Sequence, residues 1–267
     1  MIIRSSKELK EQYHNLCSGD IFLGVLTFKH LKQSILIDLL ERGVLCFPSA
    51  LSQTLNHSKA AQVIVLKKWM LPHTFVITRR VDLVDIINQY NRIGIASVVT
   101  KEDRLHCGYG IRKWDAIETL YSFMALSESS YPFVVQPFLD NFTDVRVIIA
   151  GDYVEAYVRH NPNNFRMNVS MGGKNYPFEV YKDMDEFCRA AMEKGKFPYA
   201  HMDLLITDSG EYYLSEIALN GGIKGARINR KELDQKKQTI IENLAALKEK
   251  NIRPEDGYFH GLKRRFP

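Results

Sequence analysis

Apolar runs and helical periodicity alternate near the start of the chain. Residues 20–26 and 44–47 are mostly apolar, and between them leucine and isoleucine recur from Leu31 to Leu40 at the spacing of a helix. Gly43 stands where that helix would end. The pattern predicts one βαβ unit, which we interpret as the shortened form of a larger domain.

The next segment alternates helical and strand-like patterns. Two helices and two strands are expected, in the order helix 60–68, strand 74–77, helix 83–91 and strand 95–99. The first helix should end before Leu71-Pro72, because the residue that precedes a proline avoids the helical conformation. This alternation predicts a small α+β lobe.

Strand-like runs dominate from Tyr131 onward, and they come in pairs. Each pair is divided by a turn that contains glycine, Gly151-Asp152 in the first and Ser209-Gly210 in the second. Glycine accepts the positive φ that such turns require, so the pairs predict two β-hairpins. Further helices are expected over residues 184–194 and 230–250.

These elements predict an α+β fold with four consecutive parts. They are a shortened βαβ region in residues 1–55, a small lobe in 56–132, a larger β-rich lobe in 133–250 and a basic tail in 251–267. The amphipathic helix before the tail either covers the core or forms the interface of a homo-oligomer.

The composition is that of an ordinary globular protein. The 267 residues are 45% hydrophobic, which allows a sizeable core. The four cysteines are scattered, with neither a CxxC pair nor zinc-ligand spacing, so we expect free thiols in a reducing compartment. No apolar run reaches the roughly 18 residues that span a bilayer. A cytoplasmic protein without membrane association is therefore expected.

The net charge of the chain gives little information about its binding partners. The net charge is +5, from 36 Lys and Arg against 31 Asp and Glu. The densest basic cluster, Lys263, Arg264 and Arg265, has no aromatic residues interleaved among its charges, unlike a platform that stacks bases. We expect a solvated tail there and no nucleic-acid partner.

Two acidic residues on the second predicted hairpin are the first candidates for chemistry. Antiparallel pairing can bring Asp203 close to Glu216, and two carboxylates so placed repel each other unless a cation lies between them. Magnesium with a nucleotide phosphate suits such a pair, because the ion takes its other ligands from water and phosphate. The alternative is that both are ordinary strand carboxylates facing water.

Arginines on the first predicted hairpin form a second candidate cluster. Arg146 lies two residues after Asp144 and so on the same face of its strand, and Arg159 ends the returning strand. A segment with the pattern Phe-Arg-x-Asn-x-x-x-Gly-Gly follows over residues 165–173. Forked guanidinium donors beside a Gly-Gly loop suit the binding of phosphate oxygens. Cross-strand ion pairs on a solvated face are the alternative.

The order and spacing of these motifs resemble the ATP-grasp superfamily, and within it the RimK-like ligases, over about residues 56–227. The matching positions are Ser58-Lys59, Pro72-His73-Thr74, Lys101, Cys107-Gly108-Tyr109-Gly110-Ile111, the hinge Val135-Gln136-Pro137-Phe138-Leu139, Asp144, Arg146, Arg159, Phe165, Arg166, Asn168, Gly172, Gly173, Asp203 and Glu216.

The resemblance implies two α+β lobes that grip ATP, and a role for each matched residue. It implies that Lys59 and Lys101 hold the nucleotide phosphates and that the hinge residues Gln136, Pro137 and Phe138 hold the adenine. The remaining implied nucleotide contacts are Asp144, Arg146 and Arg166, the implied catalytic residues are Arg159 and Asn168, and the implied magnesium ligands are Asp203 and Glu216.

The implied reaction is the ATP-dependent joining of a carboxylate to an amine through an acylphosphate, with release of ADP and phosphate. Both substrates would be small molecules or peptides. The mild positive charge, with Lys174 and Lys224 near the proposed site, favours an acidic substrate such as glutamate. The absence of a Ser-His-Asp or Cys-His arrangement agrees with a reaction that needs no nucleophilic side chain.

Two departures from the family pattern leave other functions open. Ala218 stands where the family has an asparagine metal ligand, and Asn220 is the nearest substitute. Ser58 stands where the family has an acidic partner of the first lysine. A nucleotide-binding module without ligase activity, and a kinase or other phosphotransferase on the same fold, are the alternatives.

Overall fold

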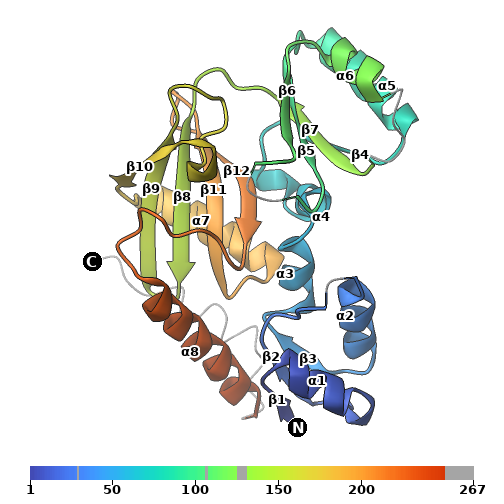
Figure 1. Ribbon diagram of the computed structural model, residues 1–267, viewed down its shortest axis with the longest axis vertical. Coiled ribbons are helices and arrows are strands. Elements are labelled where there is room, and N and C mark those ends of the chain that lie inside the picture. The colour runs from blue at the N-terminus through green and yellow to red at the C-terminus, as the bar shows by residue number, and fades with distance from the viewer. Residues whose placement is uncertain (29, 106–107, 125–130, 250–267) are drawn as a thin grey trace.

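Three β-sheets follow one another along the chain (Figure 1). The computed structural model describes residues 1–28, 30–105, 108–124 and 131–249. The predicted basic tail, residues 251–267, lies outside the described residues, and so does Cys107 of the Cys107–Ile111 motif. The predicted α+β fold class is confirmed.

The N-terminal sheet is parallel, with strand order β1–β2–β3. Its elements are β1 (Ile2–Ile3), α1 (Ser6–Gln12), a 3-10 turn η1 (Tyr13–Asn15), β2 (Ile21–Leu23), α2 (Lys32–Glu41) and β3 (Leu45–Phe47). The βαβ unit of the sequence is β2–α2–β3. Strand β1 and helix α1 were not expected, because a two-residue strand carries almost no periodic signal.

The middle sheet is antiparallel, with order β4–β7–β5–β6. Its elements are β4 (Phe75–Ile77), α5 (Arg80–Arg92), β5 (Val98–Glu102), β6 (Ile111–Trp114), α6 (Ile117–Met124) and β7 (Phe133–Pro137). Helices α5 and α6 cover one face (Figure 1) and share a core with it.

The strand expected over residues 95–99 begins three residues later than predicted. The backbone N–H of Ile95 donates to the Tyr90 carbonyl and completes the end of α5, with Gly94 at φ 74°. Ile95 therefore belongs to a helix cap, although its apolar side chain resembles the start of a strand.

The third sheet is antiparallel, with order β10–β9–β8–β11–β12, and holds the largest core. Its strands are β8 (Thr143–Ala150), β9 (Tyr153–His160), β10 (Lys174–Phe178), β11 (Tyr199–Ile206) and β12 (Tyr212–Ala218). Both predicted hairpins are present, as β8–β9 and β11–β12. A 3-10 turn η4 (Val169–Met171) precedes β10, and helix α7 (Lys182–Gly195) packs behind β11.

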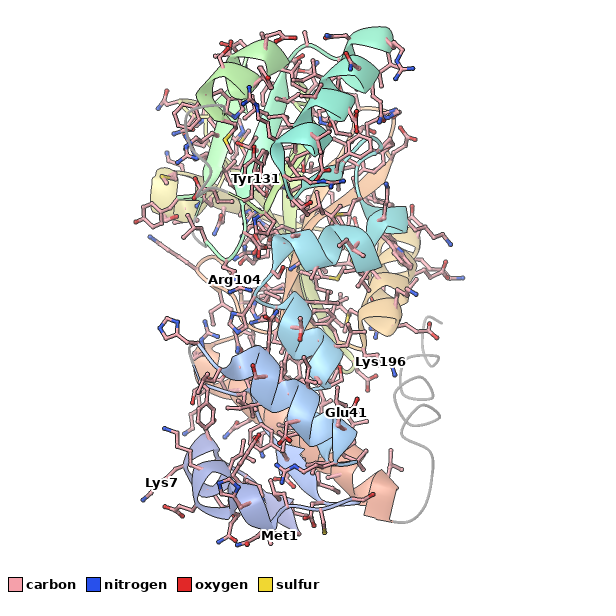
Figure 2. The ribbon with its side chains drawn as sticks, turned by 90° about the vertical axis from the view of Figure 1, so that its right-hand side faces the viewer. Met1, Lys7, Glu41, Arg104, Tyr131 and Lys196 are labelled. Carbon is pink, nitrogen blue, oxygen red and sulfur yellow. The ribbon has the colours of Figure 1, made fainter. Side chains whose placement is uncertain are left out.

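Helices join the three sheets. They are α3 (Ala50–Leu55), α4 (Lys59–Val65), which a 3-10 turn η2 (Lys67–Trp69) follows, and α8 (Arg230–Glu249). Helix α8 contacts β2 and β3 of the first sheet and β8 of the third. From the side, Tyr131 lies in the middle-sheet lobe and Lys7 at the N-terminal end, with Arg104 between them (Figure 2). In the described part of the chain, no helix is long and apolar enough to cross a membrane.

Candidate active site

Asp203 and Glu216 are direct cross-strand partners on β11 and β12, so they share one face of the third sheet. A register shift follows between Asp203 and Leu204. The sequence predicted this pairing. Both carboxylates line two cavities that meet along this face.

The arginines of the first hairpin hold Asp203 and Asp144. Arg146 grips Asp203 with two parallel bonds, Nε–Oδ1 at 2.7 Å and Nη2–Oδ2 at 2.8 Å. Arg159 bonds Asp144 at 2.5 Å through Nε and Asp203 at 3.0 Å through Nη1. These cross-strand ion pairs are buried rather than solvated, because the exposed fractions of the four side chains are 7–20%.

Charge within this cluster sets the ionisation of its acids. Burial opposes the charge on Asp203, but Arg146 and Arg159 outweigh it and hold the pKa of that carboxyl below its usual range. Burial raises the pKa of Asp144, which Arg159 only partly offsets. Asp203 is therefore an anion at neutral pH, as a metal ligand must be.

The two lysines that were predicted to bind the nucleotide phosphates both approach strand β12. Lys101 Nζ donates to Ser215 Oγ at 2.9 Å and to the Ser215 carbonyl at 3.1 Å. Burial lowers the pKa of Lys101 to about 8, with Glu216 opposing the shift. Lys59 Nζ lies 3.6 Å from Glu216 Oε1 and also donates to the Leu105 carbonyl. Lys101 lines the smaller cavity, whereas Lys59 is behind Glu216 and lines neither.

Gln62 explains how α4 is placed against β12. Its amide accepts from the Ile217 N–H at 3.0 Å and donates to the Ile217 carbonyl at 2.9 Å. The side chain is 1% exposed, so this contact is a buried two-bond clamp. It brings Lys59, at the first turn of α4, opposite Glu216.

The segment with the Gly-Gly motif closes over the smaller cavity. Gly172 has φ 93°, and a Cβ on Gly173 would lie 2.1 Å from the Met167 carbonyl oxygen, so the close approach needs glycine. Arg166 Nε donates to the Ile111 carbonyl of β6 at 3.1 Å and so ties this segment to the middle sheet. Asn168 lines both cavities.

The smaller cavity has a volume of about 150 Å³ and lies between the middle and third sheets. Its apolar side includes Val99, Phe138, Phe165 and Leu205, and its polar side includes Lys101 and the Asp203 cluster. The hinge residues Gln136, Pro137 and Phe138, for which adenine binding is a prediction, all line it. The slot has an apolar end and a charged end, but its volume is below the roughly 300 Å³ of common ligand pockets, so a nucleotide bound here would have to extend into the larger cavity.

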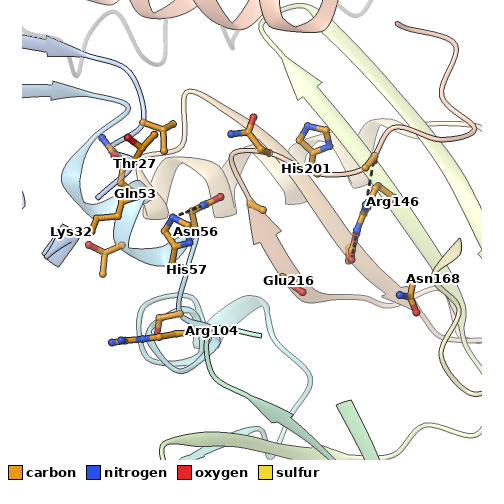
Figure 3. A pocket seen from close by; sticks show the side chains of 18 of the residues that line it. Thr27, Lys32, Gln53, Asn56, His57, Arg104, Arg146, Asn168, His201 and Glu216 are labelled. Carbon is orange, nitrogen blue, oxygen red and sulfur yellow. Dashed lines mark hydrogen bonds and ion pairs between the residues drawn. The ribbon is translucent and has the colours of Figure 1, made fainter. Parts of the chain in front are cut away.

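The larger cavity, of about 1210 Å³, extends from the same acids toward the N-terminal lobe (Figure 3). One side, the sheet wall, consists of Arg146, Arg159, Asp203 and Glu216 with their neighbours on the third sheet. The opposite side, the α2 wall, consists of residues 25–28, Lys32, Gln33, Leu36 and Gln53. The described lining residues include five Lys and Arg side chains and two carboxylates, so the lining of the cavity has an excess of positive charge.

Comparison with known proteins decides the family. The description "RimK-like ATP-grasp domain" matches residues 54–243, well over half of the chain. The chain belongs to the RimK-like ATP-grasp family. The resemblance seen in the sequence is thereby confirmed, and the ATP-grasp fold with it.

Relatives of this ATP-grasp protein include ligases. "Coenzyme gamma-F420-2:alpha-L-glutamate ligase" of Methanococcus maripaludis is 27% identical over 49% of this chain and 47% of its own. "Alpha-aminoadipate--LysW ligase LysX" of Saccharolobus solfataricus is 28% identical over 43% of each. Each match spans less than half of the relative's length.

Solved structures show the same fold at low identity. The D-alanine-D-alanine ligase of Coxiella burnetii superposes with a TM-score of 0.61 at 13% identity, covering 90% of this chain and 74% of that one. The ATP-grasp ligase PsnB, whose structure contains a minimal precursor, Mg and ADP, gives 0.55 at 16% identity over 81% and 77%. Both likenesses cover more of this chain than the family match does.

The residues of this ATP-grasp site fit a magnesium ion bound with a nucleotide. The donors are two hard carboxylates that pair across strands, and the described residues hold no cluster of three or more His, Cys, Asp or Glu. Magnesium usually takes only a few ligands from the protein and keeps water and phosphate oxygens as the others. Asp203 and Glu216 are therefore the residues that would hold it.

Position 218, where the family has an asparagine metal ligand, lies beside Lys237, a lysine that was not predicted from the sequence. Ala218 leaves no side-chain oxygen there, and Asn220 Oδ1 instead accepts a bond of 2.9 Å from Lys237 Nζ of α8. Lys237 also contacts the Leu219 carbonyl and His201 Nε2. Burial lowers the pKa of His201 to about 3, so this histidine is neutral. The role of Asn220 as a metal ligand stays a prediction.

Sequence reasoning also missed the acid that accompanies Ser58. The Asp103 carboxylate accepts from Ser58 Oγ at 3.2 Å and from the Ala60 N–H at 3.1 Å, so it caps α4 beside Lys59. Asp103 follows Lys101 by two residues and is distant from Ser58 in sequence. Only pairing across the fold reveals it.

Proposed function

We propose that this protein is an ATP-dependent carboxylate–amine ligase that works through an acylphosphate. The observation that carries the proposal is the meeting of two cavities at one charged cluster, where Arg159, Asn168, Asp203 and Glu216 line both. A ligase needs this arrangement, because the γ-phosphate must reach a carboxylate that binds in a separate space.

The nucleotide would occupy the smaller cavity. Its adenine would lie against the apolar side, which includes Phe138, with backbone groups of Gln136 and Pro137 as hydrogen-bond partners. Lys59 and Lys101 would bind the phosphates, with Arg146 and Arg166 adding charge and Asp144 orienting Arg159. Lys59 would have to exchange its contact with Glu216 for a phosphate contact.

Magnesium would be held by Asp203 and Glu216, with Asn220 as the remaining candidate ligand, and would replace part of the contacts that Asp203 makes with Arg146 and Arg159 and that Asn220 makes with Lys237. When bound, it would neutralise charge on the β- and γ-phosphates. Among this chain's own groups, Arg159 and the Asn168 amide border both spaces and would stabilise the charge of the transferred phosphoryl group.

Two displacements complete the reaction. A carboxylate oxygen attacks the γ-phosphorus, the bond to the β-phosphate oxygen breaks, and ADP leaves. An amine then attacks the acyl carbon, phosphate leaves with the bonding pair, and the amine loses a proton.

The larger cavity would hold small-molecule or peptide substrates, one of them acidic. Its excess of basic lining residues supports this, as do the printed names of the two relatives, in which glutamate and aminoadipate appear. Free Cys17, Cys46 and Cys188 support a cytoplasmic location, and neither nucleic acid nor membrane is an expected partner. A homo-oligomer through α8 is the remaining expectation about partners.

The test is to incubate the protein with Mg-ATP and pools of acidic amino acids and amines, and to measure ADP, phosphate and ligated product. Glu216→Gln should lower turnover by about 10² or more, because it removes a metal ligand. Glu211→Gln, on the exposed turn of the same hairpin, is the matched control.

The alternatives correspond to distinct results. The loss of the metal-ligand asparagine at Ala218 favours a module that binds nucleotide without turnover, and nucleotide binding unchanged in Glu216→Gln would support it. A stable phosphorylated product without a ligated one would identify a kinase. No change in melting temperature with Mg-ATP would contradict all three functions.

A further inference from the structure

The outer edge of strand β12 is covered by side chains rather than by another strand. Strand β12 is the last strand of the third sheet, and helix α4 lies beside it (Figure 1). Alternate residues of a strand direct their backbone N–H and carbonyl groups to the same edge, so residues 215, 217 and 219 share this one. An edge strand has to satisfy these groups without a neighbouring strand.

Gln62 of α4 pairs with the backbone of Ile217 as a neighbouring strand would. Its Oε1 accepts from the Ile217 N–H, and its Nε2 donates to the Ile217 carbonyl. Nε2 also donates to the Leu55 carbonyl, at the end of α3, at 2.7 Å. The amide group therefore uses its acceptor and both of its donors on backbone groups inside the protein.

Three more side chains satisfy the backbone groups on either side of Ile217. Asn56 Oδ1 accepts from the Leu219 N–H at 2.6 Å, and Lys237 Nζ donates to the Leu219 carbonyl at 2.9 Å. Lys101 Nζ donates to the Ser215 carbonyl at 3.1 Å. The edge of β12 is thus fixed by residues that lie far from it in the sequence.

Glu216 lies in the middle of this edge. Its carboxylate faces Asp203 across the strand pair and Lys59 at 3.6 Å. Gln62 follows Lys59 by three residues, about one helical turn, and bonds the residue next to Glu216. One side chain therefore sets the distance between the helix that contains Lys59 and the strand that contains Glu216.

We propose that Gln62 is a positioning residue that holds the Glu216 carboxylate, through the backbone of β12, in place for a divalent metal ion. This inference rests on the proposed function and adds a residue that lines neither cavity. Groups that orient a metal ligand typically contribute about 10–100-fold to metal affinity.

The experiment is a calorimetric titration of Mn²⁺ into protein saturated with ADP, with ADP affinity measured separately in EDTA. Gln62→Met keeps an unbranched side chain of similar length but loses the three hydrogen bonds. Mn²⁺ affinity should fall about tenfold. ADP affinity should change by less than about threefold, since Gln62 does not line the smaller cavity. Unchanged Mn²⁺ affinity, or an equal loss of both affinities, would overturn the proposal.

The matched control is Gln53→Met in helix α3. Gln53 is also buried and also makes three bonds to backbone groups, with the Leu26 N–H and the carbonyls of Pro48 and Gly24. It should destabilise the fold similarly but leave Mn²⁺ affinity unchanged, because its bonds go to the N-terminal lobe. The titration contains no carboxylate or amine substrate, so the position of Gln53 in the larger cavity does not affect it. Equal weakening in both variants would contradict the proposal.

A milder variant tests the same edge even if Gln62→Met does not fold. Asn56 is half-buried, and Asn56→Ala removes a single bond to the Leu219 N–H. Mn²⁺ affinity should fall about threefold, as expected for one neutral hydrogen bond. Unchanged Mn²⁺ affinity in Asn56→Ala would contradict the positioning role of this edge.

The unaltered protein distinguishes failure of this inference from failure of the proposed function. If it binds ADP and Mn²⁺ and Gln62→Met binds Mn²⁺ equally well, the positioning role is rejected and the ligase proposal stands. If the unaltered protein binds neither ADP nor Mn²⁺, the proposed function is rejected, and this inference with it.

Discussion

The two walls of the larger cavity differ in how their charges are satisfied. On the sheet wall, Arg146, Arg159 and Asp203 are ion-paired with one another or with Asp144, and the geometry is set by two antiparallel strand pairs. On the α2 wall, Lys32 is buried without a partner among the described residues. The difference indicates that the protein itself neutralises the charges of the sheet wall, whereas it provides no partner for Lys32 among the described residues.

The largest effect is expected from breaking the charge network of the sheet wall. Asp203→Asn leaves Arg146 and Arg159 without their shared anion and removes a proposed metal ligand. Stability should fall by about 3 kcal/mol and turnover by 10² or more, as roughly expected for a broken buried ion pair and a lost catalytic charge. Urea unfolding and product formation measure the two effects.

The matched control is Asp208→Asn, on the exposed turn of the same hairpin. It should change neither quantity by more than about 0.5 kcal/mol or its equivalent in rate. An equally stable Asp203→Asn protein would show that the network contributes no preorganisation.

The next largest effect is expected where the Gly-Gly segment borders the smaller cavity, the proposed nucleotide site. Gly173→Ala places a methyl against the Met167 carbonyl oxygen, so the segment must move, at about 1–3 kcal/mol. Since Asn168 and Arg166 move with it, ATP affinity should fall about tenfold. Gly222→Ala is the control, because its Cβ would meet Arg146 Nη1 at a comfortable 3.8 Å. Similar ATP affinities in both variants would contradict the assigned position of the loop.

A smaller effect should appear with pH. Lys101 has a pKa lowered to about 8, so it is charged below that pH and becomes neutral above it. ATP affinity should therefore fall by about tenfold between pH 7.5 and 9.5. Calorimetry without carboxylate or amine substrates measures this. Lys101→Arg keeps its charge across the range and should flatten the profile, whereas an unchanged slope would assign the titration to another group.

The smallest effect is expected from restoring the absent metal ligand. Ala218→Asn provides an amide oxygen next to Glu216 on β12, and half-maximal activity should need about threefold less magnesium. Ala218→Val adds bulk without an oxygen and serves as the control. Equal magnesium requirements in the two variants would show that Asn220 or water already fills this role.

Much of the site could be predicted from the sequence, because its residues belong to regular strands. The spacing of Asp144 and Arg146 and the turn between Asp203 and Glu216 fixed which side chains share a face. The strand β10 and helix α3 were not predicted, since such short elements carry few periodic positions. Helix α6 was also not predicted, although Ile117, Leu120 and Met124 recur at helical spacing and are buried. Lys59 was assigned to phosphate, but its present partner is Glu216.

The sequence by itself therefore determined the family, the α+β class and the paired acids, since each depends on local spacing. Tertiary structure alone decided that Asp103 accompanies Ser58 and that Lys237 holds Asn220. It also decided that Lys32 is buried in a cavity wall opposite the third sheet. These contacts join residues far apart in the chain, and burial and packing, rather than periodicity, decide which of them meet.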